Sequence, residues 1–347
     1  MAFAQRDPEE TKKALTAWFE SHGRAGTEIT DIDIPIASGW SNETLLVDTT
    51  DGPLVVRVEP TKLTVFLESN FEAQYRIMKA LAEHTDVPMP ALHSFEDDTS
   101  WLGGRFWVMD RVDGIAPQDS PPYAVEGFLL HQSPDEQRRL WDNGVDAMAK
   151  VHGVDWRALG LDVLDDRARG RTGLDQQLTY YDEYLTWAEE GRTHDLARRA
   201  LDWLRANQPP DLAPADVALC WGDSRIGNVL YDVSGGNRVV AVLDWEMAAL
   251  GDPQQDLAWF VMLDDVLTEG SGNARIPGFP SRKETIVRWE TATGRRADRF
   301  DYYEVFATFR FTVVMTRLGH LYYSLGVAPD DFAYDNFVSQ HLKRLLQ

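Results

Sequence analysis

Residues 221–232 read WGDSRIGNVLYD and residues 239–253 read VVAVLDWEMAALGDP, and these two stretches decide the fold. Apolar runs typical of buried strands each deliver an aspartate into a polar loop: VALC precedes Asp223, and VVAVL precedes Asp244. Asn228 lies five positions after the first aspartate. These polar residues either cap the turns of a hairpin or form a chemical site, and the rest of the chain must decide between the two.

The order and spacing of these three residues match the arrangement that kinases use for phosphoryl transfer. In that chemistry one Asp accepts the proton of the substrate hydroxyl, while a loop Asn and a later Asp hold Mg²⁺ against the ATP phosphates. Carboxylate and carbonyl oxygens are the ligands that Mg²⁺ prefers. Asp223 is therefore a candidate base, and Asn228 and Asp244 are candidate metal ligands.

A kinase also needs a phosphate-covering loop and a cation on a nearby strand. ASGWSNET (37–44) is a loop of small residues before a strand, and PLVVRV (53–58) places Arg57 among valines. That arginine lies either on a solvated sheet face or against phosphates. In the helix that follows, Glu72 and Gln74 flank the apolar stripe almost symmetrically, so periodicity does not choose which of them would orient Arg57.

The hydrophobic pattern predicts an α+β protein with a small β-rich N-terminal lobe and a larger, mainly helical lobe. Residues 1–112 and 113–347 are the expected domains, with a Pro- and Gly-rich hinge at 113–122. Strands are expected at 32–37, 43–49, 53–58, 91–96 and 104–112, besides the runs around the two aspartates. Helices are expected at 8–22, 69–83, 134–152, 175–190, 194–207, 253–266, 281–293, 300–324 and 330–346.

Composition excludes several classes of protein. The chain has 347 residues, 44% of them hydrophobic, and a net charge of −22. So acidic a protein repels nucleic acid and anionic membranes; the charge mildly favours a cationic substrate, but solubility alone also explains it and is the preferred interpretation. The single cysteine, Cys220, excludes an internal disulfide or a cysteine metal cluster. Without a signal-peptide pattern or an 18-residue apolar run, a cytoplasmic protein is expected, as a monomer or homodimer.

Taken together, these stretches resemble the aminoglycoside phosphotransferase family, including its acyl-CoA-dehydrogenase-associated branch. The resemblance covers roughly residues 35–265 and rests on motifs in the family's order: SGWSNET, LVVRV, FEAQYRIMKALAEHTDVPMP, FWVMDRVDG, AMAKVHGVDWRALGL, WGDSRIGNVLYD and VVAVLDWEMAALGDPQQDLAWF. The late stretch FDYYEVFATFRFTVVMTRLGHLYY also resembles that branch.

The resemblance implies a protein-kinase-like fold that uses ATP and Mg²⁺ to phosphorylate a hydroxyl of a small molecule. Asp223 would be the base and Asn228 with Asp244 the Mg²⁺ ligands. Arg225 would neutralise charge near the transferred phosphate, although a solvated loop position is equally open to it. His152 and Asp256 would pack and anchor the catalytic loop. The residues expected to contact the nucleotide are Ser38, Gly39, Ser41, Asn42, Arg57, Glu72, Met109, Asp110 and Val112.

Three positions depart from the family pattern. Trp221 stands where the family usually has a bracing His, Arg57 replaces the commoner Lys, and Gln74 replaces a Glu. Arginine keeps its charge and forks onto phosphate oxygens, so phosphate binding can survive that change. The departures leave a second hypothesis open, a pseudokinase-like nucleotide-binding module. The acceptor also stays open between an aminoglycoside, a choline-like alcohol, a sugar and a hydroxyacyl thioester.

Overall fold

The computed structural model describes residues 6–35, 42–60 and 64–347. Its packing divides the chain into an N-terminal unit, Met1–Glu83 with Pro90–Val112, and a C-terminal unit, His84–Met89 with Asp113–Gln347. The expected domains differ from these units at 84–89. That segment joins the C-terminal unit because the Val242 N–H donates to the Pro88 carbonyl (2.8 Å) and Lys150 pairs with Asp86 (3.0 Å).

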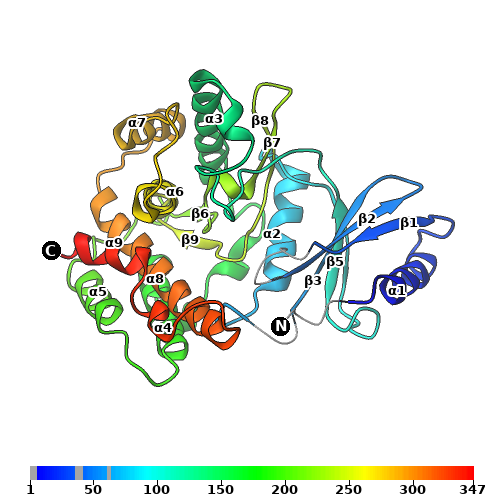
Figure 1. Ribbon diagram of the computed structural model, residues 1–347, viewed down its shortest axis with the longest axis horizontal. Helices are drawn as coiled ribbons and strands as arrows, with labels where there is room; N and C mark the ends of the chain where they lie inside the picture. Colours follow the sequence, from blue (N-terminus) through cyan, green and yellow to red (C-terminus); the bar gives the residue numbers. More distant parts are fainter. Residues whose placement is uncertain (1–5, 36–41, 61–63) are drawn as a thin grey trace. The chain divides into compact units, whose positions relative to one another are not determined.

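The N-terminal unit is built on a five-stranded antiparallel sheet with the order β1-β2-β3-β5-β4 (Figure 1). The strands are β1 Ile29–Asp33, β2 Glu43–Thr49, β3 Leu54–Val58, β4 Leu92–Glu96 and β5 Phe106–Asp110. Thr50-Asp51-Gly52 forms the turn of the β2–β3 hairpin, as the sequence predicts. The first strand begins three residues earlier than expected, because buried Ile29 is the residue that pairs with Thr49.

The described residues of this unit include the helices α1 Pro8–Ser21 and α2 Phe71–His84. Asp7 caps the first of them by accepting the N–H groups of Glu9 and Glu10. Its apolar stripe of Leu15, Trp18 and Phe19 is buried in one core with the inward side chains of the sheet. Both helices follow from the 3.6-residue periodicity of the sequence.

The C-terminal unit is mainly helical. Its α-helices are α3 Pro134–His152, α4 Leu174–Ala188, α5 Asp195–Ala206, α6 Gln254–Leu267, α7 Arg282–Thr293, α8 Phe300–Ser324 and α9 Phe337–Leu345. Within this unit α8 packs against α4, α5, α6 and α9, while α3 packs against α7 (Figure 1). Most residues of α6 and α8 are buried, so these two helices form the centre of the unit.

Two short antiparallel pairs lie among these helices. β6 Ala218–Cys220 pairs with β9 Ala249–Gly251, and β7 Val229–Asp232 pairs with β8 Arg238–Val242. The second pair is a hairpin closed by the turn at 233–237, as expected from its glycines. The first pair brings the strand before Asp223 beside the strand that follows Asp244. The two aspartates are therefore delivered by a small β island, and α3 packs against two of its strands, β6 and β8.

One expected helix, 330–346, is interrupted. A short 3-10 turn at Asp330–Ala333 is followed by a new start at α9, where the Asn336 side chain accepts the N–H groups of Val338 and Ser339. An asparagine that satisfies these otherwise unpaired donors begins a helix and does not continue one. Among the described helices, none offers the long apolar run that a lipid bilayer requires.

Candidate active site of the C-terminal unit

The loop after β6 makes a tight turn at Gly222. Its φ of +95° lies in the left-handed region, and a Cβ built there would sit 2.0 Å from the backbone carbonyl oxygen of Met247. Only glycine permits so close a contact between two backbones. The turn therefore fixes Asp223, the next residue, against the loop that carries Asp244.

Asp256, near the start of α6, anchors this loop. One carboxylate oxygen accepts the Gly222 N–H (3.0 Å), and the other accepts the Trp221 N–H (2.6 Å) and the Nε2–H of His152 (2.9 Å). The Trp289 indole donates to His152 Nδ1 (2.9 Å), which leaves Nε2 as the protonated nitrogen of a neutral ring. The expected anchoring role of Asp256, and the packing role of His152, are confirmed.

The carboxylate of Asp223 is held at both oxygens. The indole N–H of Trp259 donates to Oδ1 (2.8 Å), while Asn228 Nδ2 (2.7 Å) and Arg225 Nε (3.1 Å) donate to Oδ2. Asn228 also bonds to the backbone carbonyl of Asp223 (3.0 Å). The structure thus brings together three of the residues that the sequence singled out. Donors that fix a carboxylate in this way orient it for proton transfer.

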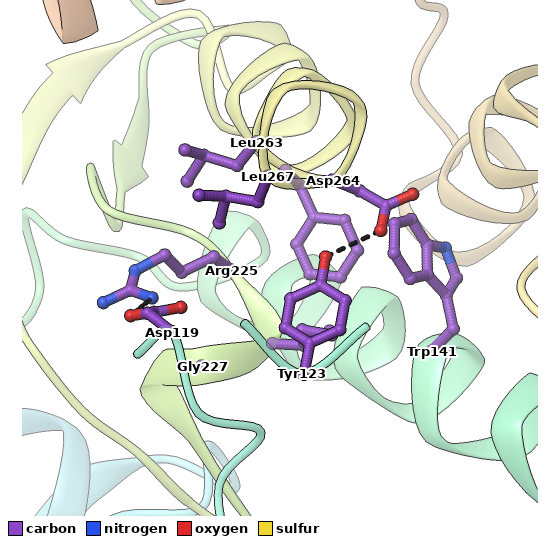
Figure 2. A pocket seen from close by; sticks show the side chains of 10 residues that line it. Asp119, Tyr123, Trp141, Arg225, Gly227, Leu263, Asp264 and Leu267 are labelled. Carbon is purple, nitrogen blue, oxygen red and sulfur yellow. Dashed lines mark hydrogen bonds and ion pairs between the residues drawn. The ribbon is translucent and has the colours of Figure 1, made fainter. Parts of the chain in front are cut away.

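Arg225 is not a solvated loop residue. Its guanidinium contacts the carboxylates of Asp119 and Asp223. Burial disfavours its charge, but these two carboxylates outweigh that penalty and raise the pKa of Arg225. Figure 2 shows Arg225 beside Asp119, on one side of a small pocket in which the Tyr123 hydroxyl donates to Asp264 (2.7 Å).

That pocket is too small for an acceptor molecule. Its free volume is about 10 Å³, the lower limit for a single water. Apolar side chains of α6, among them Leu263 and Leu267, close it from one side (Figure 2). Its lining includes Asp119 and Arg225, which form an ion pair.

Trp221, the departure from the family's His, braces the second loop. Its indole N–H is shared between the backbone carbonyls of Leu243 (2.8 Å) and Asp244 (3.0 Å), and its ring is fully buried. Asp244 has a φ of +63°, a conformation that non-glycine residues adopt at a cost and mostly at functional sites. The indole of Trp221 therefore braces the Asp244 loop by hydrogen-bonding to its backbone.

The donor set suits Mg²⁺ only together with a phosphate ligand. Within the part of the chain that the structure describes, there is no group of three or more His, Cys, Asp or Glu side chains able to hold a metal. Magnesium is usually held by one or two protein oxygens, with waters and substrate phosphates completing its octahedron. A carboxylate from Asp244 and the side-chain carbonyl of Asn228 fit that pattern.

In the N-terminal unit, Arg57 is half-buried on β3, whose neighbouring strands in the sheet are β2 and β5. Its Nη1 donates to Thr44 Oγ1 (3.0 Å), and its buried Nε has no hydrogen-bond partner among the described residues. A buried N–H without a partner costs free energy, so this is not the solvated face that the sequence left open. The geometry favours the interpretation that the Nε–H of Arg57 is available to a hydrogen-bond acceptor on a ligand.

Glu72 lies on a more exposed side of α2 than Gln74. Its carboxylate pairs with Arg76 one turn along α2, and no described contact joins it to Arg57. The buried face of α2 includes Gln74 instead, whose amide bonds to Asn42 (3.2 Å) and Asn70 (2.7 Å). These two positions are 200° apart on a helix, so the helix cannot turn both toward the sheet.

The remaining expected nucleotide residues lie in the N-terminal unit or outside the described residues. Ser38, Gly39 and Ser41 are outside them. Met109 is buried in β5, and the backbone N–H of Asp110 is already used by the Ala91 carbonyl (2.9 Å). Val112 is the last residue of the unit.

Sequence reasoning missed three residues that complete the site. Trp259 lies one turn after Asp256 on α6, a spacing that puts both on one face. Arg310 interrupts the apolar run FATFRFTVV of α8, and this lone charge was the available signal. The sequence around Asp119 carries no comparable signal, because Asp119 lies in an irregular segment far along the chain from its partner Arg225.

Comparison with known proteins supports the resemblance to the phosphotransferases. The model of the "Phosphotransferase enzyme family" matches residues 33–285. The chain is 25% identical over 319 residues to acyl-CoA dehydrogenase family member 10 of Mus musculus, an alignment that covers 88% of the chain and 27% of that protein. It spans about a third or less of the length of the curated relatives that it matches.

Solved structures show the same fold. One from Ralstonia eutropha, assigned to the aminoglycoside phosphotransferases, superposes with a TM-score of 0.69 at 24% identity and covers 96% of this chain and 95% of its own. The aminoglycoside phosphotransferase APH(4)-Ia, solved with ADP and hygromycin B, gives 0.59 at 13% identity and covers 95% and 96%. The predicted protein-kinase-like α+β fold is confirmed. The family match covers well over half of the sequence, and the chain belongs to the phosphotransferase enzyme family.

Proposed function

We propose that the chain is an ATP- and Mg²⁺-dependent kinase that phosphorylates a hydroxyl of a small molecule. The observation that carries this proposal is the state of Asp223, a carboxylate fixed at both oxygens beside Asn228 and tied through Trp221 to the Asp244 loop. Relatives solved with ADP, or with AMP-PNP and hygromycin B, support nucleotide use by this fold.

Each residue has a proposed role. Asp223 orients the acceptor hydroxyl and takes its proton as the phosphoryl group arrives. Arg225, held by two carboxylates, fixes Asp223 Oδ2 and offsets negative charge beside it. Asn228 and Asp244 supply oxygens to Mg²⁺, which when bound with ATP neutralises charge on the phosphates.

Nucleotide contacts are proposed for the N-terminal unit. Arg57 offers a half-buried guanidinium to phosphate oxygens, with Asn42 in the adjoining loop held by Gln74. Because the Asp110 N–H is taken by the sheet, the Val112 backbone is the better candidate for adenine. Met109 would pack nearby. Glu72 is not retained, since its carboxylate pairs with Arg76.

An acceptor panel tests the proposal. Purified protein and Mg-ATP would be incubated with kanamycin, hygromycin B, choline, ethanolamine, glucose or a hydroxyacyl thioester, one at a time. We expect ADP release matched by a new phosphoester signal in ³¹P NMR for at least one alcohol. Mg-ATP binding by calorimetry without a phosphoester from any of them would support the nucleotide-binding module and overturn the kinase.

Removing the indole donor of Trp221 should loosen the Asp244 loop. Trp221→Phe keeps most of the packing but leaves the Leu243 and Asp244 carbonyls without their donor, so the free energy of unfolding should fall by about 1–2 kcal/mol. We also expect about tenfold weaker Mg-ATP binding, measured by calorimetry beside urea unfolding, from a metal ligand held less rigidly.

The matched control is Trp245→Phe, which removes a buried indole bonded to the Val242 carbonyl (3.3 Å). It should destabilise the protein to a similar degree and leave Mg-ATP affinity within about twofold. Equal losses of affinity in both variants would contradict a specific role for Trp221.

A further inference from the structure

Arg310, in the middle of α8, is a fully buried cation beside the catalytic loop. Its side chain is 0% exposed; Nε donates to the Tyr181 hydroxyl (3.1 Å) and Nη2 to the Gly222 carbonyl (3.1 Å). Among the described residues, its buried Nη1 has no hydrogen-bond partner, and the ion pairs of the described chain do not include this guanidinium. The direct contacts of this charge are therefore with dipoles and aromatic rings.

Aromatic faces supply most of that compensation. The guanidinium carbon lies 4.8 Å from the ring centroid of Trp259, 5.3 Å from that of Tyr181 and 5.5 Å from that of Phe306. Such contacts stabilise a cation, and more so away from water. Even so, a buried charge costs more free energy than an apolar side chain of the same size, and packing alone gives no reason for an arginine here.

Two of the contacts of Arg310 reach Asp223. The Gly222 carbonyl belongs to the peptide that directly precedes Asp223, and the Trp259 indole donates to Asp223 Oδ1 (2.8 Å). Arg310 thus touches the backbone and the side-chain donor that set the direction of one carboxylate. Burial raises the pKa of Tyr181, Arg310 opposes that rise and Asp223 adds to it, so this hydroxyl lies within the field of both charges.

We propose that Arg310 is a positioning residue for phosphoryl transfer. Its guanidinium clamps the Gly222 carbonyl and the Trp259 ring, and so holds Asp223 in the direction that the acceptor hydroxyl requires. This inference rests on the proposed function, in which Asp223 is the base. A misplacement of about 1 Å at a reacting group can lower a rate about 10²-fold. Correct positioning of Asp223 can therefore outweigh the free-energy cost of burying the charge of Arg310.

Kinetics of five variants test it, with Mg-ATP and the panel alcohol that the wild-type protein phosphorylates fastest; one of the five is Asp223→Asn alone, which serves as the reference for a double variant. Arg310→Met keeps the apolar stem and removes the charge and both bonds; kcat should fall about 50- to 100-fold, with KM for Mg-ATP within about twofold. Arg310→Lys keeps the charge without the fork and should regain about a tenth of the wild-type kcat, which also covers the case in which the Met variant does not fold.

Arg317→Met is the matched control. Arg317 lies two turns further along α8, stacks on Trp187 (4.4 Å) and pairs with Glu190, so it shares the aromatic stacking of Arg310 but has no contact with the groups that hold Asp223 among those described. Its loss should leave kcat within about twofold. The fourth variant combines Arg310→Met with Asp223→Asn, and should be no more than about twofold slower than Asp223→Asn alone, because Arg310 acts through that carboxylate.

The outcomes separate the two claims. If the wild-type protein phosphorylates an alcohol but Arg310→Met keeps its kcat, or if the losses multiply in the double variant, the positioning role is overturned and the kinase stands. If the wild-type protein transfers no phosphate to any panel alcohol, the proposed function fails, and the role of Arg310 fails with it.

Discussion

Substituting asparagine for Asp223 should lower kcat for phosphoryl transfer by about 10²-fold or more, while Mg-ATP still binds within about threefold. The amide cannot take the proton of the acceptor hydroxyl, and losses of this size are usual when a general base is removed. All the side chains proposed to contact nucleotide and metal are retained, and Asn228 is the one among them that bonds to the substituted side chain. Steady-state kinetics and calorimetry on the same preparation measure the two quantities.

Asn at this position also changes the hydrogen bonding, so folding must be checked beside the rate. Asp223 accepts from Trp259, Arg225 and Asn228, and an amide has one oxygen fewer to offer. Asp232→Asn is the matched control, since Asp232 closes the β7–β8 turn by accepting Ser234 Oγ, the Gly235 N–H and the guanidinium of Arg238. It should keep kcat within about twofold. Full turnover in the Asp223 variant would remove the base from the mechanism.

Substituting asparagine for Asp256 should lower both the free energy of unfolding and the rate. Its two oxygens accept two backbone N–H groups and the Nε2–H of His152, so an NH₂ in either orientation faces a buried donor. Leaving such donors unsatisfied costs about 3 kcal/mol. Because the Gly222 turn loses its anchor, kcat should also fall about tenfold or more at temperatures where the variant stays folded. Urea unfolding and kinetics measure the two effects.

Asp264→Asn separates stability from catalysis. Asp264 is a second buried acid on α6; it accepts the Tyr123 hydroxyl (2.7 Å) and pairs with Arg275 (2.5 Å), and burial raises its pKa. Its substitution should also destabilise the unit, but leave kcat within about threefold. If both variants lost the same fraction of activity, the effect of Asp256 would be a consequence of stability alone.

Much of the fold could be predicted because long amphipathic stripes specify helices. α3 begins and ends at the expected residues, since its buried positions recur at helical spacing over many turns. α8 also has its expected bounds, although most of its residues are buried and it has no single apolar stripe. The break at Asn336 could not be read, because a polar residue inside a helical pattern is a cap only if its side chain turns back onto the backbone. Local pattern does not decide between those two states.

The site shows the same limit. The order and spacing of the polar residues in the sequence identified Asp223 and Asn228 as candidates, and in the structure a hydrogen bond joins them. Between Glu72 and Gln74 the sequence had no preference, because the choice depends on which face the sheet buries. The role of Trp221 depends on two carbonyls more than twenty residues away, and no local rule connects them. Tertiary contacts, not propensities, decide such residues.

The contact between Gly222 and Met247 bears on how this motif can change in evolution. Any side chain at position 222 would collide with a backbone oxygen, and backbone cannot be moved aside by one substitution. The preceding position is different, because a bracing donor there needs only to reach the Leu243 and Asp244 carbonyls, and an indole does so here. In the WGD triplet, position 221 can therefore change in evolution, whereas position 222 must remain glycine.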